Sequence, residues 1–186
     1  MKKQFREAVS YIRVSRGYIY FALFFFLLFV FFGFYFSKNL GFIDDFLKEL
    51  IDRVRGLSLI EMILFILQNN IQASLYGLVF GAFFAIFPLL NIVVNGVVVG
   101  YVLAKVGELT GLYEIWRLLP HGIFELPAVF ISLGLGLKLG MFIFSKKPGL
   151  ELRKRFFESL NVFLFIVVPL LIIAAIIEGI LIFIFK

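Results

Sequence analysis

The only histidine of the chain, His121, precedes Glu125 by four residues in the run PHGIFELP. Residues four apart share one face of an α-helix, so an imidazole and a carboxyl group meet there if the run is helical. Strongly apolar stretches flank the run, which places both groups at or inside a lipid boundary. Ionisable side chains at that depth usually face a bundle interior or a water-filled cavity, which makes this pair a functional candidate.

Other polar residues stand in apolar surroundings and complete a candidate cluster: Asn70, Asn91, Asn95, His121, Glu125 and Glu178. Two interpretations stay open. In the first, the asparagines hydrogen-bond across helices and His121 pairs with Glu125, so the cluster locks a bundle together. In the second, the cluster lines a polar pocket in which Glu125 or Glu178 ionises or carries a proton.

Catalytic and metal chemistry have little support in the sequence. The chain has one histidine and no cysteine, so the ligands of a common zinc site cannot be completed. No glycine-rich phosphate loop follows a strand, and no nucleophile stands in a recognisable motif. We therefore expect a non-enzymatic protein with no catalytic residue, no metal and no cofactor.

The composition is that of a membrane protein. Hydrophobic residues make up 62% of the chain and the mean hydropathy is +1.07, whereas soluble domains contain roughly 45–50% apolar residues. The apolar runs are continuous rather than alternating, which argues against a β-barrel. The net charge of +6 gathers near the predicted membrane ends, so it favours orientation and anionic headgroups over nucleic acid.

The elements that must position these residues are helices. We predict an all-α transmembrane bundle of about five spans, because each span needs roughly 20 residues. The expected spans are residues 18–36, 58–87, 89–106, 122–144 and 160–185. The chain is expected to form one membrane domain, with residues 1–57 as the first span and an amphipathic helix and residues 58–186 as the core.

Two segments between the spans are predicted to lie at the membrane surface or against other protein rather than across the membrane. Residues 38–56 place apolar side chains on one helical face and charged ones on the other. This pattern is typical of a helix lying on a membrane surface or on a partner, and equally of a short connecting helix packed on its own bundle. Residues 112–119 contain Trp116 and are expected at the headgroup level. Helix breaks are expected at Pro88, Pro120 and Pro127 because proline removes a backbone donor.

Glycines spaced four apart allow helices to approach closely in lipid. The candidate packing pairs are Gly77 with Gly81, Gly96 with Gly100, and Gly136 with Gly140. They predict that the second, third and fourth spans form the packed core and that the Phe- and Ile-rich first and fifth spans lie at the periphery. We also expect that two copies can form a homodimer, because exposed ridges of small residues allow helices to pack closely.

Basic residues suggest the orientation in the membrane. Five precede the first span (Lys2, Lys3, Arg6, Arg13, Arg16), and five stand between the fourth and fifth spans (Lys146, Lys147, Arg153, Lys154, Arg155). With five spans both groups lie on one side, which the positive-inside rule makes cytoplasmic. We expect a multi-pass protein of the cytoplasmic membrane with its amino terminus inside and its carboxyl terminus outside.

The chain resembles the stage II sporulation protein M family from about residue 59 to residue 180. The most specific part is the run PHGxxELPA, from Pro120 to Ala128. The other matching residues are Ile66, Leu67, Asn70, Gly77, Gly81, Pro88, Asn95, Gly96, Gly100, Ala174, Ala175 and Glu178.

The resemblance implies a multi-pass membrane protein without known catalytic activity. In spore-forming bacteria the namesake joins and recruits two wall-degrading partners during engulfment, and a transport role has been suggested for other members. Two functions therefore stay open for this chain. One is a membrane scaffold that gathers partner proteins, and the other is a small-solute or ion transporter whose path the polar cluster lines.

Overall fold

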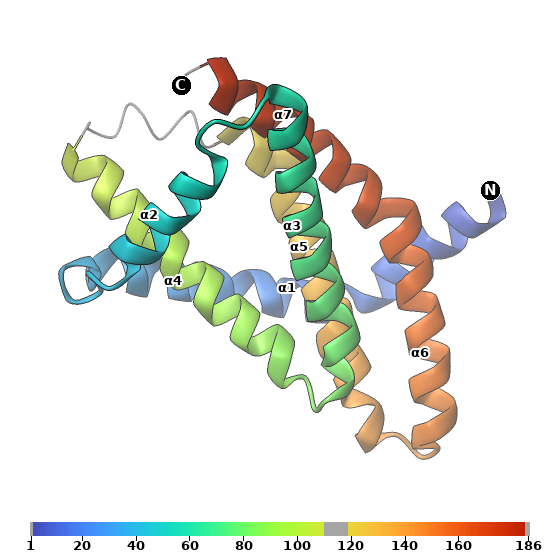
Figure 1. Ribbon diagram of the computed structural model, residues 1–186. Helices are drawn as coiled ribbons and strands as arrows, with labels where there is room; N and C mark the ends of the chain where they lie inside the picture. Colours follow the sequence, from blue (N-terminus) through green and yellow to red (C-terminus); the bar gives the residue numbers. More distant parts are fainter. Residues whose placement is uncertain (1, 110–118, 185–186) are drawn as a thin grey trace.

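The computed structural model describes residues 2–109 and 119–184, without the side chains of Ile51, Leu109 and residues 119–121 (Figure 1). Over these residues the chain is helical, and the predicted all-α bundle is confirmed. The α-helices are α1 (Lys2–Tyr35), α2 (Ile43–Val54), α3 (Leu59–Val79), α4 (Ile86–Leu109), α5 (Leu119–Gly140), α6 (Pro148–Val162) and α7 (Val168–Ile184).

In the described part of the chain, five helical segments are long and apolar enough to cross a membrane: Lys2–Tyr35, Leu59–Ala82, Ile86–Glu108, Gly122–Phe144 and Pro148–Ile184. Gly122–Phe144 is the most deeply buried of them. Figure 1 shows α3 and α5 side by side in the middle of the molecule, with α4 on one side, α7 on the other, and α1 crossing them. The predicted number of spans is confirmed.

Helix α1 begins well before the predicted span of residues 18–36. Its buried positions are Ala8, Ser15, Ala22, Phe26 and Gly33, which follow one another by seven or four residues and therefore form a single stripe along the helix. The stripe packs on α4, α5 and α6. Because packing continues along this stripe, the basic amino-terminal arm is helical as well.

Helix α2 occupies the predicted amphipathic segment. Asp44 and Asp45 stand in its first turn and Arg53 in its last, which suits the helix dipole. Asp44 fixes this helix to α4: its Oδ1 accepts a hydrogen bond from the Tyr101 hydroxyl at 2.5 Å, and its Oδ2 lies 3.9 Å from Lys105 Nζ.

Helix α3 starts with a capping box. The Ser58 hydroxyl accepts from the Glu61 backbone N–H, and the Glu61 carboxylate accepts from the Ser58 backbone N–H at 2.9 Å. The helix ends at Val79 and not at Phe87 as predicted. The short 3₁₀ turn η2 (Phe80–Ala82) follows, and Phe84 and Ala85 then take left-handed φ angles of 55° and 60° that reverse the chain into α4.

None of the three predicted helix breaks interrupts a helix. Pro88 and Pro120 lie in the first turns of α4 and α5, where the missing N–H has no intrahelical partner to lose. Pro127 lies inside α5, which continues to Gly140. Pro88 and Pro120 therefore mark the beginnings of helices, and Pro127 is accommodated within a continuous helix.

The predicted basic linker after α5 is helical from Pro148 onward, with this proline at the first turn of α6. A short 3₁₀ segment, η4 (Met141–Phe144), precedes it. A π-helical turn, η5 (Phe163–Val167), joins α6 to α7 directly before Pro169. Since Pro169 cannot donate to the carbonyl one turn earlier, a widened turn at this point is the expected accommodation. The last span is consequently one long helix with a bulge.

Glycines produce the closest helix contacts. A Cβ atom added at Gly136 would overlap the carbonyl oxygen of Gly77, and one at Gly81 would overlap the carbonyl oxygen of Gly136, so α3 and α5 touch backbone to backbone. At Gly96 an added Cβ would lie 2.8 Å from Phe29 Cβ, and at Gly100 it would overlap Val30.

The glycine pair of α4 thus packs on α1, not on the second or fourth span. α7 is equally integrated, because a Cβ added at Gly179 would lie 2.5 Å from Ile63 of α3. The prediction that the first and last spans are peripheral was wrong. Their bulky sequences contain small residues at the contact positions, such as Ala22, Gly33 and Ala174, and these residues permit close approach.

The amino-terminal end of α1 lies beside α6. Asn161 Nδ2 donates to the Gln4 carbonyl at 3.0 Å, and Lys138 Nζ of α5 donates to Ser15 Oγ at 2.9 Å. The two basic groups of the sequence are therefore on neighbouring elements. Their orientation relative to the cytoplasm stays a prediction.

Candidate functional site

The register between α3 and α5 determines the level of Glu125. The Ser132 hydroxyl donates to the Ser74 carbonyl at 2.6 Å, and Gly136 faces Gly77 about one turn further along. The two helices are therefore parallel. Glu125 precedes Ser132 by seven residues, or about two helical turns. It consequently stands at the level of Leu67, which precedes Ser74 by the same interval.

Helix α7 brings Glu178 to within about one helical turn of that level. Gly179 lies against Ile63, and Ala175 belongs to one buried cluster with Met62 and Ile66 of α3. Glu178 and Glu125 are both partly buried, and their carboxyl groups are close enough to interact electrostatically. Two acidic groups from separate spans thus meet between α3, α5 and α7.

Asn70 and the two asparagines of α4 are placed differently. Asn70 follows Ile66 by one turn of α3, so it stands one turn further into the bundle than the carboxyl groups. Asn95 Nδ2 donates to the Asn91 carbonyl at 2.9 Å and to Asn91 Oδ1 at 3.0 Å. These two side chains satisfy each other on α4, whose main neighbour is α1. The predicted cluster therefore divides into two groups.

His121 lies in the first turn of α5. Its side chain falls outside the described part of the structure, as do residues 112–118 of the predicted interfacial segment. The predicted contact of His121 with Glu125 stays a prediction.

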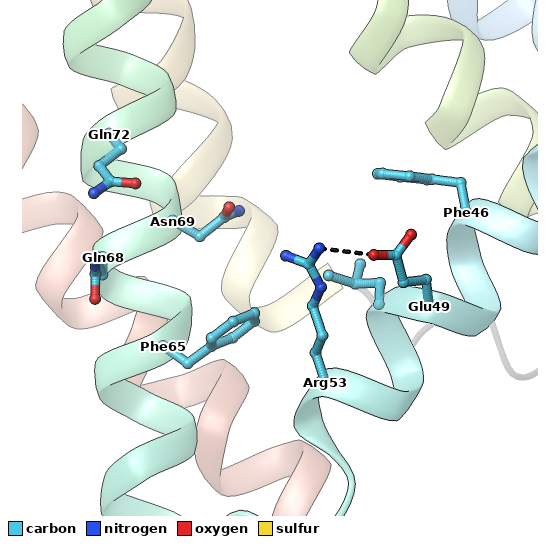
Figure 2. A pocket seen from close by; sticks show the side chains of 8 residues that line it. Phe46, Glu49, Arg53, Phe65, Gln68, Asn69 and Gln72 are labelled. Atoms are coloured by element: carbon cyan, nitrogen blue, oxygen red, sulfur yellow. Dashed lines mark hydrogen bonds and ion pairs between the residues drawn. The ribbon is translucent and has the colours of Figure 1, made fainter.

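A polar groove opens between α2 and α3 (Figure 2), with a volume of about 320 Å³. One wall is the side of α2 that carries Phe46, Glu49, Leu50 and Arg53, and in it Arg53 Nη2 lies 2.7 Å from Glu49 Oε1. The other wall contains three amides of α3: Gln68, Asn69 and Gln72. Asn69 points toward the Arg53–Glu49 pair. The groove therefore combines amide donors and acceptors with an ion pair.

These amides lie near the middle of the candidate span Leu59–Ala82. In hydrocarbon an unpaired amide costs several kcal/mol, of order 4–8 on a cyclohexane scale, so these amides require water, α2 or a polar ligand as a neighbour. The sequence shows these amides and Asn70 as a run that is unusually polar for a lipid-exposed helix, but the predicted cluster included only Asn70. Gln68, Asn69 and Gln72 follow the spacing of one helix face, and that signal identifies the wall of the groove.

Metal binding is not evident from the geometry. Among the residues that the structure describes, no group of three or more His, Asp or Glu side chains is placed to hold a metal ion. The available chemistry is that of two neighbouring carboxyl groups, an amide-lined groove and an amphipathic helix.

The fold and these polar groups define a polytopic, all-helical membrane protein with ionisable groups inside its bundle. The pattern described as Stage II sporulation protein M matches residues 22–181, so the chain belongs to that family. The match begins within α1, earlier than the resemblance from residue 59 suggested.

A relative from Methanocaldococcus jannaschii, itself described as uncharacterized, is 32% identical over 126 residues, which cover 64% of this chain and 55% of the relative. The chain thus spans about half the length of the curated relative that it matches. No solved structure matches it.

Proposed function

We propose that this protein is a non-enzymatic scaffold of the cytoplasmic membrane that holds partner proteins through α2. The observation that carries the proposal is the way α2 is presented. Asp44 binds Tyr101 and Lys105 of α4, so one end of α2 is fixed to the bundle. Three apolar side chains remain exposed here: Phe42, directly before α2, by 71%, and Phe46 and Leu50 of α2 by 56% and 38%.

Apolar residues fixed in this way favour recognition. A large side chain held on an anchored helix loses little freedom on binding, and buried aromatic residues supply much of the affinity of protein interfaces. An apolar groove of about 380 Å³ also runs beside Phe42 and Phe46, against Val94 and Val97 of α4. A partner helix with an apolar face matches this combination of ridge and groove.

The test compares two substitutions on opposite sides of α2. Phe46→Asp places a carboxylate on the apolar side, whereas Lys48→Asp changes a 72% exposed side chain on the charged side. Tagged variants are purified from membranes of the native host, and the co-purifying proteins are quantified by mass spectrometry. We expect Phe46→Asp to lose specific partners while Lys48→Asp keeps them. Wild-type recovery of every partner by a folded Phe46→Asp variant contradicts the proposal.

Transport is the second candidate, favoured by the Glu125–Glu178 pair and the amide groove. Transporters place their sites near the bilayer midplane, on helices that carry polar groups there. A path for an ion or small polar solute would use the carboxyl pair together with Asn70 and His121.

Flux into liposomes tests this candidate. Wild type is compared with Glu125→Gln and His121→Ala, and Lys48→Asp serves as a control outside the bundle. Loss of flux in the first two variants alone supports transport. Absence of flux for every ion and solute tried, with folded protein, removes the support for this candidate.

A further inference from the structure

Two cavities meet along one face of α1, at the end of the bundle where α1 lies beside α6. The first, of about 400 Å³, is polar and touches Glu7, Ser10, Tyr11 and Val14 of α1. The second, of about 510 Å³, is apolar and touches Val14, Gly17, Tyr18 and Phe21. These positions advance by three or four residues, so the cavities follow one stripe of the helix with Val14 at their junction.

The walls opposite α1 differ in polarity as the two cavities do. Lys138 of α5 and a helical stripe of α6 close the polar cavity; the α6 residues are Glu151, Lys154, Arg155 and Glu158. Apolar residues from α4, α5, η4 and the turn after α3 line the other cavity, namely Phe84, Ala85, Leu89, Leu137 and Met141. The combined space is therefore amphipathic, with its polar end toward the amino terminus of α1.

The dimensions fit one leaflet of a bilayer. From Glu7 to Phe21 the helix advances about 21 Å, because each residue contributes about 1.5 Å. A leaflet consists of about 15 Å of hydrocarbon and a further 5–7 Å of headgroup. The apolar part of the stripe also begins where the apolar run of α1 begins, near Gly17. A molecule that is charged at one end and apolar at the other has the required length.

The charges of the polar cavity indicate the headgroup. Arg155 is already engaged, since its Nε lies 3.1 Å from Glu151 Oε2 and its Nη1 donates to the Lys138 carbonyl at 2.8 Å. Both signs of charge remain among the lining residues: Lys138 and Lys154 are cationic, and Glu7 and Glu158 are acidic. Lys138 is held in place, with its Nζ 3.7 Å from the centre of the Tyr11 ring.

We infer that this space binds one phospholipid with a zwitterionic, primary-amine headgroup. The phosphate pairs with Lys138 and Lys154, the ammonium group with Glu7 and Glu158, and an acyl chain occupies the groove beside Gly17. A purely anionic headgroup would bring its charge next to two carboxylates without compensating them. A quaternary ammonium group has no N–H to donate to them. The inference is independent of the scaffold and transport proposals.

The experiment measures lipid retention by native mass spectrometry of the full chain. Detergent micelles contain phosphatidylethanolamine, phosphatidylcholine or phosphatidylglycerol with identical acyl chains. We expect phosphatidylethanolamine to be retained about tenfold more than either of the others, the effect of one charge-assisted hydrogen bond. Equal retention of all three, or preference for phosphatidylglycerol, overturns the headgroup assignment.

Two sets of variants separate the groove from the headgroup cavity. An added Cβ has open space at Gly17 and at Gly41, so Gly17→Trp fills the groove without a backbone clash and Gly41→Trp is its matched control. Gly17→Trp should abolish retention and Gly41→Trp should not. The double variant Glu7→Gln with Glu158→Gln should shift the preference to phosphatidylglycerol. Wild-type retention by Gly17→Trp, or an unchanged preference in the double variant, overturns the inference.

Discussion

Replacing Gly136 by alanine tests the backbone contact between α3 and α5. The added Cβ would overlap the Gly77 carbonyl oxygen and lie 3.1 Å from its carbonyl carbon. Backbone atoms cannot rotate away as a side chain does, so the two helices must separate. Gly122 of the same helix is the matched control, because among the residues that the structure describes its added Cβ would meet only the Leu126 side chain, at 3.8 Å.

The two variants differ mainly in the packing cost. An alanine inside a helix gains about 1 kcal/mol of helix propensity over glycine, and Gly122, in the first turn of α5, gains no more than Gly136. The measured difference is therefore a lower bound on the packing cost. Overpacking of a tight interface costs about 1–3 kcal/mol. For a chain of this length the melting temperature changes by roughly 2–4 °C per kcal/mol. Gly136→Ala should therefore melt about 2–12 °C below Gly122→Ala.

The measurement is a thermal melt in detergent, with the folded fraction determined by size-exclusion chromatography after heating. Both variants are compared in the same micelle, so that detergent effects are shared. If Gly136→Ala and Gly122→Ala melt together, α3 and α5 do not touch at their glycines, and the register that places Glu125 opposite Leu67 loses its basis.

Two further outcomes follow from local geometry. Asp44→Ala removes the hydrogen bond that fixes α2 to α4, so a cysteine introduced at position 46 should react faster with a thiol reagent. Asp45→Ala is the control: it also removes a first-turn carboxylate, together with an exposed ion pair worth about 0–1 kcal/mol, and it should leave that rate unchanged. Phe84→Gly should stabilise the turn after α3 by about 1 kcal/mol because Phe84 has a positive φ. Phe83→Gly, at a φ of −86°, should destabilise the same turn in thermal melts.

Hydropathy and periodicity were sufficient for much of the fold. They predicted the number of spans and the segment that became α2, because these features depend on local sequence. Helix–helix pairing depends on which small residues lie on which face. The stripe of Ala8, Ser15, Ala22 and Gly33 on α1 was visible in the sequence, but the phenylalanines around it suggested a peripheral helix. Composition alone therefore misplaced α1.

The site was predicted less completely, for two physical reasons. Glu125 and Glu178 belong to different spans, and only the parallel register of α3 and α5, with α7 beside them, brings the acids to nearly one level. The groove wall of Gln68 and Gln72 faces α2, a helix that the sequence allowed to lie on the membrane, on a partner or on its own bundle. Neither relation is encoded in local spacing.

The packing glycines and the acidic pair are parts of one arrangement. Gly77 and Gly136 fix how far α3 and α5 can slide along each other, and Gly179 fixes α7 against α3. The level of Glu125 relative to Glu178 is set by these contacts, since neither carboxyl group belongs to a flexible loop. A substitution that separates the helices at Gly136 should therefore also change the interaction between Glu125, which lies about three turns earlier on α5, and Glu178 of α7. Under either proposed function, the small residues of the bundle determine the geometry of its charged interior.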